Sequence, residues 1–312
     1  MRILVHSLAL IVLPIIVAWH GLSVTGAVAV VMLLLLWRWA ISVSMTLSPP
    51  KKPELELETI AASHYAEKVR WCLDRLGLEY HEKTVAGIFG VLFTGRSVPK
   101  LTFRTGLVQS TIGNSPEILR YLWGRYGNEL GDTAAFLEPT TERVEMERRL
   151  DRYGAYLQVW VYYHILDHRD VTMKAWGVSA PEVPAWQRAL MPLLYPLFVA
   201  FLRKALQISE AHYEKVVSKI ETVLVDVESR LDDGRRSILG GDDTDYVDIT
   251  FASFTALWIQ PEQFAAGIVP SARVDRANYP IQMGVDVERW TDQYPLAVAL
   301  AERLYREERI SG

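Results

Sequence analysis

The chain has 312 residues, half of them hydrophobic, and a formal net charge of −4. The first fifty residues hold two arginines and no acidic residue, which leaves a charge of −6 on the rest. A mildly acidic body argues against nucleic acid as the main partner. The single cysteine, Cys72, excludes an internal disulfide and a cysteine-rich metal site. The seven histidines show no metal-binding spacing, so we expect no metal.

Residues 1–47 predict a membrane anchor. Residues 3–19 and 24–37 are almost wholly apolar, and the second run continues to about Met45. Because a spanning helix needs about 20 apolar residues, two arrangements fit. One is a helical hairpin that turns at residues 20–23, and the other is a single span with the first run at the interface. A cleaved signal peptide is the alternative, but no small-x-small cleavage site follows the first run.

Residues 48–53, which contain three prolines, predict an extended linker between the anchor and the next domain. In the hairpin arrangement every basic residue near the anchor lies on one side of the membrane: Arg2, Arg38, Lys51 and Lys52. The positive-inside rule makes that side the cytoplasm. We therefore expect a membrane-anchored protein whose soluble domains are cytoplasmic.

A strand followed by a capped helix opens the next domain. Residues 55–62 suit a short buried strand, and Ser63 then stands at the N-cap of a helix that ends at Gly77. The apolar residues of this helix recur at helical spacing, with Glu67, Lys68 and Arg70 on the other face. A hydroxyl at a helix N-terminus lies in a field that favours anions, thiolates included. We expect His64, beside it, to be a surface residue.

Residues 54–127 alternate between strand and helix patterns. A second strand is predicted at residues 78–85, an irregular segment with a short helix at 86–95, and a strand from Val98-Pro99 to Phe103. A fourth strand at residues 106–109 completes a hairpin. Asn114, Ser115 and a following proline then open another helix. Residues 110–113 are interpreted as a short insertion before that helix.

Residues 139–312 contain helical patterns and no convincing strand. Long helices are predicted at residues 142–163 and 210–231, and a last one at 294–308. Asp245, as N-cap, and Asp248, as its capping-box partner, open a buried helix. The very apolar residues 185–208 predict a buried, kinked helix, with a second membrane contact as the alternative. Trp160, Tyr162 and Tyr163 fit core packing better than a binding pocket.

Four of these motifs, taken together, resemble the glutathione S-transferase superfamily. Residues 63–71 resemble its signature at the first strand–helix junction, and Val98-Pro99 resembles its Val-Pro pair with a cis proline. Asn114-Ser115 resembles the acidic-Ser pair before the next helix, and residues 239–249 resemble the capping motif of the helical domain. The resemblance covers the chain from about Glu54 onward.

The resemblance implies an α/β thioredoxin-like domain, residues 54–127, followed by an all-α helical domain, residues 139–312. It implies glutathione as co-substrate, with Ser63 as the catalytic residue that stabilises the thiolate. Val98 and Pro99 would pair with the peptide of glutathione, and Asn114 and Ser115 would bind its γ-glutamyl end. A hydrophobic electrophile would bind between the two domains. A homodimer is a further expectation.

The sequence departs from the family pattern at two site positions. His64 stands where a proline is common, and Asn114 replaces the usual acid, which removes a charge that would meet the amino group of glutathione. Three functions remain open on this reading. The first is a membrane-anchored detoxifying transferase, the second a non-catalytic binding or scaffold protein, and the third a glutathione-dependent isomerase.

Overall fold

The computed structural model describes residues 12, 15, 16, 20, 24–47, 52–85, 98–105, 108–178, 180, 183–264, 274 and 276–309. The chain divides into two units, residues 1–53 with 104–109, and residues 54–103 with 110–312. We call the second unit the body. The predicted short helix at 86–95 and most of the first apolar run lie outside the described residues. The predicted domain limits at 54–127 and 139–312 stay predictions, because both parts lie within the body.

The N-terminal unit contains the helix α2, Val24–Leu47, which has 24 residues and a single charged side chain, Arg38. At 1.5 Å per residue this helix is about 36 Å long. Within the part of the chain that the structure describes, one helix is both long and apolar enough to cross a membrane, judged by length and composition alone. That helix is Ala185–Ala205, in the body, while the apolar stretch Val24–Ala40 is shorter.

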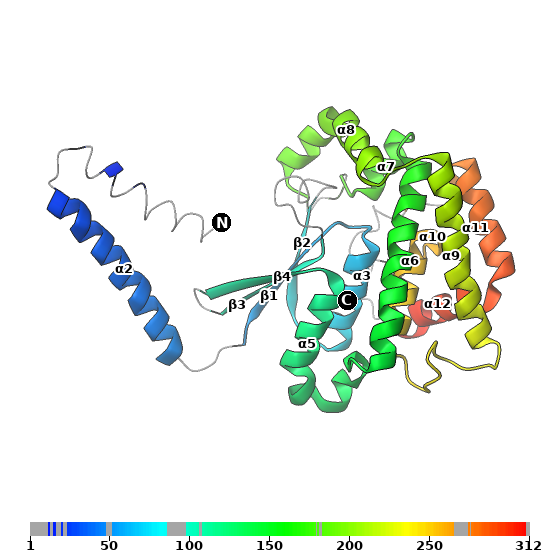
Figure 1. Cartoon of the computed structure of the whole chain (residues 1–312), viewed down its shortest axis with the longest axis horizontal. Coiled ribbons are helices and arrows are strands. Elements are labelled where there is room, and N and C mark those ends of the chain that lie inside the picture. The colour runs from blue at the N-terminus through cyan, green and yellow to red at the C-terminus, as the bar shows by residue number, and fades with distance from the viewer. Residues whose placement is uncertain are drawn as a thin grey trace. The chain divides into compact units, whose positions relative to one another are not determined.

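A four-stranded sheet belongs to the first half of the body, apart from residues 104–105 and 108–109, which fall in the first unit (Figure 1). Its strand order is β2-β1-β3-β4. The strands are β1 Glu54–Thr59, β2 Tyr80–Thr84, β3 Lys100–Thr105 and β4 Val108–Gly113. β1 and β2 are parallel, with Leu55 opposite Tyr80, and the helix α3, His64–Arg75, connects them. This is a thioredoxin-like sheet, as the resemblance implied.

The fourth strand is longer than predicted, and the proposed insertion at residues 110–113 is wrong. These residues belong to β4, which runs without a break to the helix α5, Ser115–Leu130. The hydroxyls of Thr102 in β3 and Thr111 in β4 lie 2.9 Å apart, which ties the extended part of the strand to its neighbour. Such a polar strand end offers no apolar alternation, and alternation is the signal by which strands are recognised in a sequence.

The second half of the body is helical, and the described residues after Gly113 contain no strand. Its elements are η1 Gly131–Leu137, α6 Thr141–Ile165, α7 Arg169–Ala175, α8 Ala185–Ala205, α9 Glu210–Leu231, α10 Tyr246–Ile259, η4 Arg276–Asn278, α11 Ile281–Gln293 and α12 Pro295–Glu307. The capping box that opens the buried helix α10 is present as predicted. Asp245 accepts from the backbone N–H of Val247 and Asp248, and Asp248 accepts from that of Asp245.

The apolar segment near residue 190 forms one continuous helix, α8, and only one of its faces is buried. Pro196 cannot donate a backbone hydrogen bond to the carbonyl of Pro192. The guanidinium of Arg169 donates to that carbonyl instead, at 3.0 Å. The carbonyl oxygen of Pro192 therefore keeps a hydrogen bond, although both prolines lie inside the helix. The predicted helix is therefore confirmed, while the prediction that it is buried holds for one side only.

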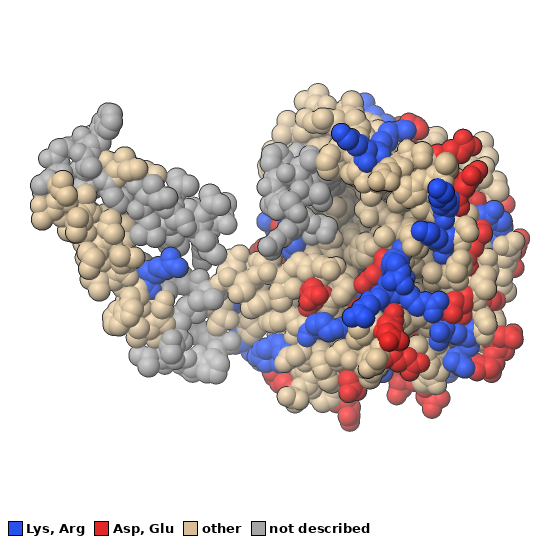
Figure 2. All heavy atoms as spheres, viewed as in Figure 1, with Lys and Arg blue, Asp and Glu red and all other residues tan. Residues whose placement is uncertain are grey.

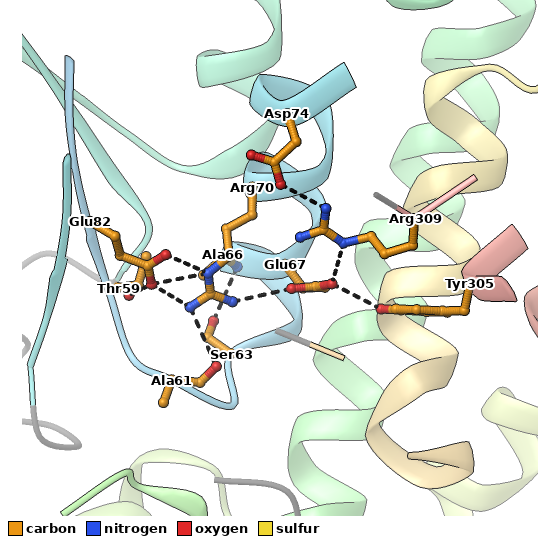
Figure 3. A network of polar contacts seen from close by, with 10 residues as sticks. All are labelled: Thr59, Ala61, Ser63, Ala66, Glu67, Arg70, Asp74, Glu82, Tyr305 and Arg309. Carbon is orange, nitrogen blue, oxygen red and sulfur yellow. Dashed lines mark hydrogen bonds and ion pairs between the residues drawn. The ribbon is translucent and has the colours of Figure 1, made fainter. Parts of the chain in front are cut away.

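The charged face of α3 is buried by the helical half of the body. Glu67, Lys68 and Arg70 have no exposed surface. α10 packs against α3, and Tyr305 of α12 donates its hydroxyl to Glu67 at 3.3 Å. Figure 3 shows how the charges of Glu67 and Arg70 are matched. Arg70 contacts Glu82 of β2 at 2.7 Å and Glu67 at 3.3 Å. Arg309, which follows α12, contacts Glu67 at 2.9 Å.

The pKa of Glu82 is consistent with a well-compensated buried charge. Burial would raise the pKa of this carboxyl group, but the opposing charge and hydrogen bonds of Arg70 hold it below its ordinary value. Lys68 is likewise paired with Glu147 of α6 at 2.7 Å. Pairs of this kind add little net stability, but removing one partner leaves a buried charge without compensation. The α3 charges therefore fix how the helical half sits on the sheet.

We expect Arg309→Ala to lower the free energy of unfolding by about 3–5 kcal/mol, because the buried carboxylate of Glu67 then loses one of its two guanidinium partners. Urea unfolding followed by tryptophan fluorescence measures the change. The matched control is Arg306→Ala, since that arginine is exposed and pairs with the exposed Glu307. The control should cost less than about 0.5 kcal/mol. Equal losses in the two variants would contradict a structural role for the α3 network.

Candidate functional site

The N-terminus of α3 carries the first predicted site residue, Ser63. Its backbone is extended, and its Oγ accepts from the backbone N–H of Ala66 at 3.3 Å, as an N-cap does. The side chain is partly exposed. The predicted cap is therefore confirmed, and the hydroxyl hydrogen remains free of this bond because Oγ acts in it as the acceptor. A ligand anion beside Ser63 would meet a hydroxyl donor and the positive end of a helix.

The Val98-Pro99 peptide bond is cis, as the resemblance predicted. Asn114 holds a left-handed backbone conformation, with φ at 73°, and its exposed side chain makes no capping hydrogen bond. Ser115, next to it, is 1% exposed. The Oγ of Ser115 makes no hydrogen bond to any part of the chain that the structure describes. A buried hydroxyl at the start of a helix normally has a hydrogen-bond partner. A ligand with a hydrogen-bond acceptor could supply that partner for Ser115.

One cavity in the body, of about 630 Å³, brings all five predicted site residues together: Ser63, Val98, Pro99, Asn114 and Ser115. The roles of these residues remain predictions, but their meeting at one cavity is a property of the fold. Helices of the second half close the other side. Tyr162 of α6, Trp176, and Leu202 of α8 contribute mainly apolar walls there. The cavity thus has a polar end at the sheet and an apolar end at the helices.

His64 is buried, and the expectation that it is a surface residue is wrong. It is 5% exposed, and its ring lies 4.9 Å from that of Phe254. Its Nε2 lies 3.2 Å from the carbonyl oxygen of Gly154, so that nitrogen carries the hydrogen and donates. Burial lowers the pKa of His64 to about 3, against the weaker opposite effect of the Gly154 bond. The ring is neutral near pH 7 and a poor proton acceptor.

Gly154 allows α6 to lie close to the start of α3. A Cβ atom at this position would lie 2.8 Å from the ring of Phe254 and 3.0 Å from the hydroxyl oxygen of Tyr65. Tyr65, which also lines the cavity, donates its hydroxyl to the carbonyl of Asp151 at 3.3 Å. Because that hydroxyl hydrogen is used, Ser63 is the better placed donor at this helix end.

Asp151 of α6 is a cavity residue that the sequence did not single out. One of its carboxylate oxygens, Oδ1, is buried, lies 3.7 Å from Nζ of Lys68, and makes no hydrogen bond within the described residues. Burial raises the pKa of Asp151 although Lys68 opposes the shift. Nothing in the sequence marks this residue among the many charges of α6. The side chain can receive a cationic group from a ligand.

The remaining candidates behave as structural residues. Cys72 is fully buried, and burial raises the pKa of its thiol to about 12, so it stays protonated and unreactive. Trp160 lies in the core and donates to Asp286 at 2.8 Å. Tyr162 packs against the core as predicted, and it also lines the cavity. The described residues contain no group of acidic, histidine and cysteine side chains suited to a metal ion.

No family model matches this sequence, and no curated protein matches it either. Solved structures do match. A glutathione S-transferase from Methylobacterium radiotolerans, solved with glutathione sulfonate, is 18% identical over 83% of this chain and 96% of its own, with a TM-score of 0.48. Ure2p5 from Phanerochaete chrysosporium, cocrystallised with 1-(S-glutathionyl)-2,4-dinitrobenzene, is 17% identical over 83% of this chain and 97% of its own, with a TM-score of 0.44.

A glutathione S-transferase from Methylobacillus flagellatus with GSH bound is 14% identical over 82% of this chain and 100% of its own. Its TM-score is 0.45. At these identities and TM-scores the likeness carries no functional information. Any assignment of function to this chain has to rest on its own residues and on the geometry of the cavity.

The pH dependence of stability should report the burial of His64. Its folded-state pKa of about 3 lies below the ordinary 6.5, so the unfolded chain binds the proton more readily between these values. The stabilising effect is present above pH 6.5 and is lost as the pH falls toward 3. We expect His64 to contribute a loss of about 2 kcal/mol between pH 7 and pH 5, and His64→Gln should remove this contribution. Urea unfolding at the two pH values measures it.

Asp248 provides a control of opposite sign. Burial, and then the charge of Asp245, raise the pKa of Asp248 to about 6, so its contribution to stability grows as the pH falls from 7 to 5. Asp248→Asn should therefore make the acid loss larger, whereas His64→Gln makes it smaller. An unchanged pH dependence of stability in His64→Gln would mean that His64 binds its proton as readily in the folded protein as in the unfolded chain.

Proposed function

We propose that the chain is a membrane-anchored, glutathione transferase-like enzyme that joins the glutathione thiolate to a hydrophobic electrophile. One observation carries the proposal, namely the gathering of Ser63, Val98, Pro99, Asn114 and Ser115 around one cavity. These residues come from three separate segments, and the resemblance had picked each of them for glutathione. The apolar far end of the cavity supplies room for the second substrate.

Ser63 has the role of thiolate stabiliser in this proposal. Its hydroxyl donates to the sulfur, and the N-terminus of α3 adds a field that favours the negative charge. The thiolate attacks the electrophilic carbon, a C–S bond forms, and the leaving group departs with the electron pair or the acceptor takes it up. The thiol proton goes to solvent, because His64 is too weak a base near pH 7.

Ser115 and Val98 bind the peptide part of glutathione. The buried Ser115 hydroxyl, at the start of α5, donates to the γ-glutamyl carboxylate. The backbone of Val98, before the cis proline, pairs with the cysteinyl part of the ligand in the manner of an added strand. Asn114 adds an amide without charge at the same end. This arrangement leaves the ligand's amino group to be met from elsewhere.

Asp151 supplies the carboxylate for that amino group. Asn114 stands where the resemblance expected an acid, and the cavity has a partly buried acid on its α6 side instead. An ammonium group in the cavity would meet the exposed part of this carboxylate, whose side chain is 28% exposed, while Lys68 lies beside Oδ1. The γ-glutamyl end would then be held from both halves of the body, Ser115 on one side and Asp151 on the other.

The helix α2 is the membrane anchor of the proposal. Its apolar side chains are exposed, among them Val24, Leu33 and Trp37, and it holds one charge in 24 residues. The linker prolines separate it from the body, and the basic residues beside it favour a cytoplasmic body. Reporters fused before Met1 and after Ser23 decide between one span and a hairpin. Opposite locations for the two reporters would support the hairpin, and a shared location would support the single span.

The full chain should bind glutathione, measured by calorimetry in detergent micelles. No binding at millimolar glutathione would contradict the transferase and favour the scaffold alternative. Binding without conjugation of any model electrophile, but with turnover of a cis–trans substrate, would favour the isomerase alternative.

Ser63→Ala should lower the rate of conjugation with a model electrophile by roughly a hundredfold and leave glutathione affinity within severalfold. The matched control is Ser209→Ala. Ser209 is the N-cap of α9, where its Oγ accepts from His212 at the same 3.3 Å, and it does not line the cavity. Both variants lose a helix cap, but only Ser63→Ala loses the thiolate donor. Equal rates in the two variants would mean that Ser63 is only a cap.

Ser115→Ala and Asp151→Asn should each weaken glutathione binding by about tenfold and leave the maximal rate nearly unchanged, because both contacts are made before the reaction and during it. Kinetics at varied glutathione concentrations separates affinity from rate. Asp292→Asn, at an exposed position on α11, is the control and should change neither value. A glutathione analogue without the amino group should bind wild type and Asp151→Asn equally well.

A further inference from the structure

One side of α8 presents a continuous apolar stripe to the surface. It consists of Trp186, Leu190, Leu193, Leu197 and Phe201, which are 41–75% exposed. The residues recur every three or four positions, so they lie along one face of the helix. Single exposed apolar side chains are ordinary, but a contiguous row of large ones marks a surface that contacts something apolar.

The opposite side of α8 fixes it to the body. Met191, Tyr195, Phe198 and Leu202 are buried in a cluster with Trp176. An apolar helix of this length is often the core helix of a soluble domain, yet only 22% of its most apolar stretch is buried. Because one side is packed against protein, α8 is placed to lie along a membrane surface and not to cross it.

The charges on α8 match an anionic surface. The helix carries Arg188, Arg203 and Lys204 and no acidic residue. Arg203 contacts Asp167 at 2.6 Å, so one of the three charges is partly offset. In Figure 2 the surface over α8, at the top of the body, is mostly tan, with basic side chains beside it. Leucine, tryptophan and phenylalanine on one face of a helix that also carries basic and no acidic residues are typical of helices that lie in the interface of anionic membranes.

The stripe continues into the candidate site. Phe201 is 41% exposed and also lines the cavity, together with Leu202, Ala205 and Leu206 of the same end of α8. A molecule that leaves an apolar phase at the stripe therefore reaches the apolar end of the cavity past Phe201. A lipid bilayer can deliver hydrophobic ligands along this continuous surface. A contact with a second protein would not require the stripe to reach the cavity.

We infer that α8 lies on an anionic lipid bilayer with its apolar stripe in the acyl boundary, and that hydrophobic ligands enter the cavity from the bilayer along Phe201. This inference rests on the proposed function in one respect only, since the proposed anchor α2 keeps a bilayer within reach. It goes beyond an anchor, because an anchor alone leaves α8 in water.

A spin label at position 193 tests the contact in the full chain, reconstituted in vesicles of phosphatidylcholine and phosphatidylglycerol. Leu193→Cys introduces the labelled thiol at the most exposed stripe residue, and the buried Cys72 stays unlabelled. We expect the label to be accessible to oxygen, which concentrates in lipid, and protected from a water-soluble nickel chelate. Val225→Cys is the matched control, at an apolar α9 residue that is 53% exposed, and should show the reverse.

Each other outcome overturns the inference. If the labels at positions 193 and 225 are equally accessible to the chelate, the chain is held by α2 alone and the stripe faces water. If label–label dipolar broadening appears at position 193, a second copy of the chain covers the stripe. If the chain does not sediment with the vesicles, the stripe and α2 both fail as lipid contacts. Because no outcome depends on turnover, the test is separate from the proposed reaction.

Activity supplies a second measurement. Leu193→Gln with Leu197→Gln should lower the rate with a bilayer-dissolved electrophile by about tenfold and leave the rate with a water-soluble electrophile unchanged. Neither residue lines the cavity. Equal effects on the two rates would contradict entry from the bilayer. A wild-type chain that is inactive toward both electrophiles would contradict the proposed function, and the spin-label result would still stand.

Discussion

The burial of the charged face of α3 is the constraint on which the rest of the body depends. Arg70 is held between Glu82 of the sheet and Glu67, and Glu67 is held in turn by Arg309 (Figure 3). A charge in the interior tolerates little displacement, so these contacts fix one position of the helices against the sheet. The start of α3, with Ser63, then opens into a cavity whose far wall the same helices build.

Local signals predicted much of this structure. The cap at Ser63 and the capping box at Asp245 were predicted because each depends on residues within three positions of one another. Val98-Pro99 was predicted as the cis bond through the resemblance. Alternating apolar residues predict the strands, and β4 extends beyond its predicted end where polar residues continue the strand.

The features that the sequence did not predict are those that need a distant partner. Periodicity separates two faces of α3, but it does not show that both faces are covered, so it gave no sign that Lys68 is buried against Glu147. His64 was placed at the surface for the same reason, since Phe254 and Gly154 are far away along the chain. Asp151 stands among many charges of α6, and only the fold selects it.

The long separation between Glu67 and Arg309 has a consequence for synthesis on the ribosome. The two residues are 242 positions apart, so at roughly 5–20 residues per second α3 waits tens of seconds for its partner. An apolar face would spend that time exposed and prone to aggregation. An ionic face stays hydrated until Arg309 has been synthesised and can pair with Glu67. The charges that orient the finished body also keep the unfinished one soluble.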